Sequence, residues 1–176
     1  MEQKTFALKG NIIYTKERTR FEVMEQGWLV CEEGRVRDVY SVLPEELKGI
    51  PVEDMGDRLI IPGLTDLHIH APQYTFRSLG MDMELLEWLE TNTFPEESKY
   101  KDAEYAQKAY GMFAEQLKKS ATVRACIFGT IHNEATLILM DLLEEAGLHT
   151  MVGKVNMDRN SPDYLCEPSA EASAQA

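Results

Sequence analysis

The sequence predicts an α/β protein in which parallel strand–helix units follow a β-rich segment. Residues 5–61 alternate apolar and polar side chains, with glycines at the breaks, as half-buried strands and tight turns do. From Leu59 onward, continuous apolar runs alternate with amphipathic patterns of helical period. Two histidines, His68 and His70, end the first of those apolar runs. These three observations set the fold class and indicate where a functional site would lie.

The first predicted domain, residues 1–62, is a small β-rich unit. Its strands come from TFALKGNIIYT, FEVMEQGWLVCEEGRVRDVYS and DMGDRLIIPG. Gly27 and Gly34 are expected in tight turns between strands, and EEG at 32–34 is typical of a hairpin connection. Pro44, followed by EELKG, predicts one short helical turn. We find no cluster of chemically active side chains in this segment.

The second predicted domain, residues 63–176, contains the strand–helix units. Its first strand lies in the run LIIPGLTDLHI, whose continuous apolar character is typical of a strand buried on both faces. The later predicted elements are helices at 83–90 and 103–119, a strand at 122–130, a helix that ends at Ala146 and a strand at 149–157. Strand–helix–strand alternation indicates a parallel sheet. Three such strands cannot close a barrel, so we expect the chain to stop after its third barrel strand.

Three residues mark the predicted helix ends. Asp102 is expected to cap the helix at 103–119, and Asn133 is expected to cap the next helix, because short polar side chains satisfy free N–H groups at helix starts. Gly147 is expected to terminate that second helix, since glycine adopts the left-handed conformation at this position easily.

Composition excludes several classes of protein. The 176 residues carry a net charge of −12, whereas a nucleic-acid-binding protein concentrates Lys and Arg, so we expect no nucleic-acid partner. No run of about 18 apolar residues and no apolar leader occurs, so we expect neither a membrane partner nor a secretory signal. The three cysteines, Cys31, Cys126 and Cys166, form no C-x-x-C pair, which favours reduced thiols in the cytoplasm and no cysteine-built zinc site.

The pair His68 and His70 is the candidate metal site. Residues i and i+2 of a strand point to the same side, so both imidazoles can bind one divalent metal, at about 2.0–2.1 Å for zinc. Barrel enzymes also place their sites at the C-terminal ends of strands. Asp66 would share that side, either as a buried hydrogen-bonding partner or as support for the ligands. Lone histidines are more often ordinary core or surface residues, so the pair alone does not establish a metal site.

The surrounding motifs resemble a known family. IIPGLTDLHIH is similar to the first barrel strand of the amidohydrolase superfamily of metal-dependent hydrolases. HIHAPQY, LLEWLETNTFPEE, FGTIH and VGKVNMDRNSPDY are similar, at matching intervals, to the guanine deaminases of that superfamily. The resemblance implies a (β/α)8 TIM-type barrel, of which this chain holds the N-terminal part, preceded by part of a small β-sandwich at residues 1–62.

The resemblance also implies roles for individual residues. His68 and His70 would be ligands of Zn²⁺, with Fe²⁺ as the open alternative, because imidazoles accept several first-row metals. Gln73 would contact the purine base, since its amide offers a donor and an acceptor together. Ala71 and Pro72 would border the same pocket.

Other positions stay open. Trp88 is read either as a pocket wall or as packing of a helix on the barrel, and His132 either as a site-facing residue or as a helix cap or supporting residue. His149 and His132 are the other histidines, and neither fits the ligand pattern. The catalytic glutamate and the metal-bound aspartate of the family cannot be matched to this sequence.

The implied reaction is zinc-dependent hydrolytic deamination of guanine to xanthine and ammonia, a purine-breakdown or salvage step. Another amidohydrolase activity, on a triazine or an adenosine-type substrate, is the nearest alternative. The unrelated zinc deaminases need H-x-E with P-C-x-x-C; His132-Asn133-Glu134 has no such partner, so that class is excluded. A non-catalytic fragment, or one piece of a split protein, is the remaining alternative, and we expect little turnover from the 176-residue chain alone. A homodimer is implied for the full-length family.

Overall fold

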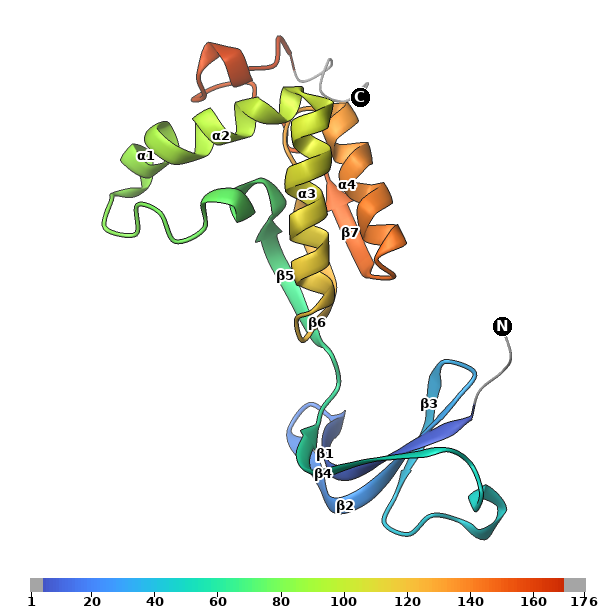
Figure 1. Cartoon of the computed structure of the whole chain (residues 1–176). Coiled ribbons are helices and arrows are strands. Elements are labelled where there is room, and N and C mark those ends of the chain that lie inside the picture. Colours follow the sequence, from blue (N-terminus) through green and yellow to red (C-terminus); the bar gives the residue numbers. More distant parts are fainter. Residues whose placement is uncertain (1–4, 170–176) are drawn as a thin grey trace. The chain divides into compact units, whose positions relative to one another are not determined.

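The computed structural model describes residues 5–169, which divide into two compact units between Pro62 and Gly63 (Figure 1). Within this described part of the chain, no helix is long and apolar enough to cross a membrane.

The first unit is a four-stranded sheet with the order β3-β2-β1-β4. Its elements are β1 (Phe6–Glu17), β2 (Arg20–Glu32), β3 (Arg35–Tyr40), the 3₁₀ turn η1 (Glu45–Leu47) and β4 (Val52–Ile60). The first three strands are antiparallel neighbours, and β4 runs parallel to β1. The described residues of this unit form one sheet, and a sandwich requires a second sheet packed on it, so the predicted β-sandwich stays a prediction.

Turns in this unit match the sequence in one place and differ in another. The predicted hairpin at 32–34 is confirmed, because Glu33 and Gly34 join β2 to β3 with positive φ angles of 54° and 75°. The predicted turn at Gly27 is wrong. Gly27 lies within β2 opposite Gly10, where a Cβ would come within 2.6 Å of the Met24 side chain. Close packing, not turn geometry, is the role of this glycine.

The second unit is a three-stranded parallel sheet with the order β5-β6-β7, as the strand–helix alternation predicts. The strands are β5 (Leu64–His70), β6 (Thr122–Phe128) and β7 (His149–Gly153). The helical elements are η2 (Ala71–Phe76), α1 (Leu85–Trp88), η3 (Leu89–Thr93), α2 (Phe94–Ser98), η4 (Lys99–Lys101), α3 (Ala103–Lys118), α4 (Asn133–Glu145) and η5 (Asp163–Leu165). The long helices α3 and α4 connect successive strands and lie side by side (Figure 1).

The core of this unit lies between the helices and one face of the sheet. Phe113 of α3 and Leu139 of α4 are buried against Ala125 and Ile127 of β6. The other face of the sheet has no such cover among the described residues, and Leu67 of β5 is 73% exposed there.

That exposure corrects the predicted strand at 59–69. Leu59 and Ile60 end β4 of the first unit, and β5 begins only at Leu64. Most of β5 is exposed, so it is not buried on both faces in this structure. The apolar run therefore contains parts of two strands in two units, which hydrophobicity alone does not separate.

The helix ends follow the expected chemistry with one change. The Asp102 carboxylate accepts hydrogen bonds from the backbone N–H groups of Glu104 and Tyr105, at 2.9 and 3.3 Å, which confirms this cap. The N-cap of α4 is His132, not Asn133, which is the first helical residue. Gly147 follows the end of α4 with φ of 74°, as predicted.

Candidate metal centre

His68 and His70 lie together at the C-terminal end of β5. Their Nε2 atoms are 3.2 Å apart, and their ring centroids are 5.0 Å apart. His68 is exposed, and His70 is partly buried. The strand therefore presents two ring nitrogens to one point, at the end of a parallel sheet where barrel enzymes keep their sites.

The spacing of the two nitrogens fits a shared metal ion. Two nitrogens bound to one tetrahedral zinc at about 2.0–2.1 Å lie roughly 3.3–3.4 Å apart, close to the separation of the His68 and His70 Nε2 atoms. The same contact suits a hydrogen bond between the rings, because one Nε2–H can donate to the other nitrogen. Burial, together with the neighbouring His68, lowers the pKa of His70, which favours the neutral imidazole that metals bind.

Phe128 completes the surroundings of the pair. Its ring centroid lies 4.8 Å from that of His68 and 4.9 Å from that of His70, and it is nearly parallel to the His70 ring. Phe128 ends β6 and is level with His70 in the parallel register. Sequence reasoning missed it, although the last residue of the neighbouring parallel strand is the position that such a register brings to this place.

Asp66 does not share the side of the histidines, which corrects the simple alternation argument. Asp66 is level with Ala125, and Ile69 is level with Ile127. Three residue steps along β5 therefore match two residue steps along β6. This bulge places Asp66 with the helix-facing residues. Its carboxylate accepts a hydrogen bond of 3.0 Å from the backbone N–H of His68, and so it braces the bulge beside the first histidine.

The remaining histidines do not join the pair. Within residues 5–169, no group of three or more His, Cys, Asp or Glu side chains could hold a metal ion. His149 begins β7 and is level with Arg124, near the opposite end of the sheet from His70. The Nε2 atom of His132 is buried without a hydrogen-bond partner, and burial and Lys101 lower the pKa of this ring.

The chain continues from the histidine pair directly into η2, which carries Gln73. Gln73 is partly buried, whereas Ala71 and Pro72 are fully buried. The Tyr100 hydroxyl donates to the Pro72 carbonyl at 3.2 Å. The purine contacts predicted for Gln73, Ala71 and Pro72 stay predictions.

Trp88 has a defined structural task. Its indole N–H donates to the Leu79 carbonyl at 3.0 Å, and its ring lies 5.6 Å from that of Phe76. Trp88 therefore fastens the segment between η2 and α1. Packing of its helix on the barrel and a contact with substrate both stay predictions.

Comparison with known proteins places these observations in a family. Residues 59–176 match the sequence model of the amidohydrolase family. The chain belongs to the amidohydrolase family. The fold is accordingly of the TIM-barrel α/β type, and the described strands β5 to β7 are its parallel units.

Within the amidohydrolases, the chain is similar to guanine deaminases, as the motifs predict. It is 34% identical to the guanine deaminase of Dictyostelium discoideum, over 93% of this chain and 40% of that protein. It is 36% identical to the guanine deaminase of Escherichia coli strain K12, over 85% of this chain and 34% of that protein. The crystal structure of guanine deaminase from C. acetobutylicum with bound guanine superposes with a TM-score of 0.86 at 44% identity, covering 93% of this chain and 39% of that chain. The chain thus spans about a third to two fifths of the length of these relatives.

The triazine hydrolases share the amidohydrolase fold at lower similarity. A triazine hydrolase variant superposes with a TM-score of 0.74 at 15% identity, which shows the fold alone. The higher identity to guanine deaminases favours them over the triazine alternative.

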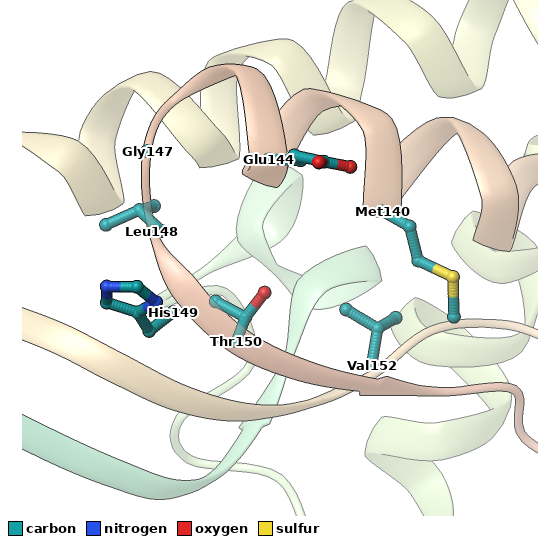
Figure 2. A pocket seen from close by; sticks show the side chains of 7 residues that line it. All are labelled: Met140, Glu144, Gly147, Leu148, His149, Thr150 and Val152. Atoms are coloured by element: carbon teal, nitrogen blue, oxygen red, sulfur yellow. The ribbon is translucent and has the colours of Figure 1, made fainter. Parts of the chain in front are cut away.

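A hollow of this amidohydrolase chain lies between α4 and β7 (Figure 2). Thr150 and Val152 of β7 face Met140 and Glu144 of α4 across it. It opens beside β7, which has only β6 as a neighbour in the described sheet, and it includes His149 near the opposite end of the sheet from His70. The hollow is therefore separate from the histidine pair.

Proposed function

We propose that His68 and His70 hold a zinc ion that serves the hydrolytic deamination of guanine to xanthine and ammonia. The observation that carries this proposal is the 3.2 Å separation of the two Nε2 atoms at the end of β5. The chain around them is 44% identical to a guanine deaminase that was crystallised with guanine in its active site. The metal, the substrate and their residues are proposals for this chain.

Each residue has a defined task in this proposal. The two imidazoles bind the metal as neutral ligands, and the lowered pKa of His70 keeps that form available near neutral pH. Zinc supplies Lewis acidity that makes water nucleophilic near pH 7. Gln73 orients the base, because its amide presents one donor and one acceptor edge to the purine. Phe128 lies against both rings and restricts their rotation.

We propose that this chain by itself deaminates guanine slowly or not at all. Catalytic zinc takes about three protein ligands besides water. The described residues bring two histidines together and no third His, Cys, Asp or Glu.

Fe²⁺ is the metal we would test next, since histidine ligands accept it. The three cysteines are free thiols, in agreement with a proposed reducing, cytoplasmic location.

A second candidate function is that of one piece of a split enzyme. Leu67 is 73% exposed and Met151 is 68% exposed on the sheet, and within residues 5–169 the edge strands β5 and β7 each have an unpaired side. Exposed apolar side chains beside open strand edges favour association with another polypeptide. This candidate is compatible with both the proposed low turnover and the proposed metal site.

The deciding experiment combines zinc titration with a measurement of ammonia release from guanine. We expect one zinc per chain, lost when both His68 and His70 are replaced by alanine and kept in His149→Ala. We expect little ammonia from the chain alone. Failure to bind zinc would refute the metal proposal, whereas rapid turnover would refute the proposal that the site is incomplete.

A further inference from the structure

The η2 loop that carries Gln73 is fastened to the helices by a buried carboxylate. The Thr75 hydroxyl donates to Glu96 Oε1 at 2.6 Å, and the Tyr105 hydroxyl donates to the same oxygen. Lys99 Nζ donates to Glu96 Oε2 at 2.6 Å. Glu96 thus accepts hydrogen bonds from three side chains. Thr75 lies in the loop, Lys99 in η4 and Tyr105 in α3.

The carboxylate is held in place as an ionised acceptor. Glu96 is only 8% exposed, and burying a charge is unfavourable unless hydrogen bonds and a counter-charge compensate. Burial acts to raise the pKa of Glu96, but the hydrogen bonds from Lys99, Thr75 and Tyr105 lower it below its ordinary value. Burial and the bond to Glu96 also raise the pKa of Tyr105 to about 12, so this hydroxyl keeps the proton that it donates.

These bonds bracket Gln73 on both sides. Pro72, on one side, receives the hydrogen bond of Tyr100 through its carbonyl. Thr75, two residues after Gln73, donates to Glu96. Between them, Tyr74 packs on Phe113 with ring centroids 5.8 Å apart. Gln73 is the partly buried polar residue of a loop whose neighbours are all anchored.

We infer that Glu96 is a positioning residue: through Thr75 it fixes the backbone of η2, and thereby the direction of the Gln73 amide relative to the histidine pair. The inference rests on the proposed function, because the purine is the ligand for which this direction matters. A planar base that is read by one donor and one acceptor requires such a fixed amide, since a free rotor would lose the pairing. Glu96 therefore contributes to the selection of the base and not to the binding of the metal.

The test is a guanine titration of the zinc-loaded chain, followed by NMR of the Gln73 side-chain amide. Thr75→Val removes the hydroxyl at nearly constant shape, Thr75→Ser keeps it, and Glu96→Gln removes the charge of the acceptor. Glu97→Gln is the matched control, since Glu97 is buried on the same helix and its buried Oε2 atom has no hydrogen-bond partner. Thr75 is exposed, so the valine variant is expected to fold.

We expect Thr75→Val and Glu96→Gln to weaken guanine binding about tenfold, as the loss of a bond to a charged group does. Thr75→Ser and Glu97→Gln should bind like the wild type, and all four variants should keep their zinc affinity within about twofold. Guanine affinity unchanged in Thr75→Val would overturn the inference.

A different result would separate this inference from the proposed function. If the wild-type chain does not bind guanine, the proposed function fails for this chain, and amide hydrogen exchange then decides the role of Glu96. Exchange at residues 73–76 about tenfold faster in both Thr75→Val and Glu96→Gln than in Thr75→Ser would still show that Glu96 holds the loop; the Glu96 variant is needed because the Thr75 hydroxyl also lies 3.4 Å from the Pro72 carbonyl. Exchange in Glu96→Gln equal to that in Thr75→Ser would refute it.

Discussion

The two faces of the parallel sheet in the second unit differ in what they do. One face carries Ala125 and Ile127 under the long helices, and its partner Leu139 is fully buried. The other face carries the histidine pair, and Leu67 is 73% exposed there. Because strand residues outside the bulge between Asp66 and Ile69 alternate between the two sides, one short sheet can separate stability from a candidate site. Substitutions on the two faces should therefore affect different measurements.

The largest expected effect compares the same deletion on both faces. Leu139→Ala leaves a cavity in the core under the helices and should lower the free energy of unfolding by about 2–5 kcal/mol. Leu67→Ala, on the open face, should change it by less than about 0.5 kcal/mol. Urea unfolding followed by circular dichroism measures both. A large loss in Leu67→Ala would show that a second layer covers this face in solution.

The next effect tests the buried acid beside the helix-covered core. Glu97 is 3% exposed, and burial raises its pKa from an ordinary 4.5 to about 7. The folded protein therefore retains a proton that the unfolded chain releases between these pH values. Stability should fall as the pH rises from 4.5 to 7, by at most about 3 kcal/mol, and then level off.

The matched variant for this pH effect is Glu97→Gln, which is neutral at every pH. It should be more stable than the wild type at pH 8 and nearly equal to it near pH 4.5. Urea midpoints measured from pH 4.5 to 8 give the comparison, and parallel pH profiles for the two proteins would contradict the buried, protonated carboxyl.

The third effect belongs to the open face. His70→Ala should weaken zinc binding by at least about 10- to 100-fold, more than the loss of a supporting residue does, while the free energy of unfolding without metal changes little. His149→Ala is the control, because His149 lies near the other end of the sheet. Competition with a zinc indicator measures the affinity. Equal affinities for the two variants would place the metal elsewhere.

The smallest effect concerns the aromatic ring beside the histidines. Phe128→Leu removes the ring contacts to His68 and His70 and should weaken zinc binding by roughly 2- to 10-fold, the equivalent of one aromatic pair. Calorimetric zinc titration measures this change. A stronger affinity in the leucine variant would mean that the ring hinders the metal instead of orienting its ligands.

The sequence predicted features that depend on neighbouring residues well, and features that depend on contacts between strands poorly. The sequence predicted the cap at Asp102 and the hairpin at Glu33-Gly34, because each depends on a few adjacent residues. It also predicted the parallel strands, because helices alternate with them along the chain. The bulge that moves Asp66 to the other side depends on the neighbouring strand β6, which a periodic pattern in β5 does not report. The same holds for Phe128, which reaches the histidines only through strand register.

By itself, the sequence determined the α/β class, the order of the units and the two histidines at a strand end, since these depend on hydrophobic period and on neighbours along the chain. Only the tertiary structure decided which side Asp66 takes, which ring lies against the imidazoles and which carboxylate fastens the loop of Gln73. The physical reason is that a bulge, a ring contact and the hydrogen bond from Thr75 to Glu96 form between segments distant in sequence, where packing selects among geometries that local patterns leave equal.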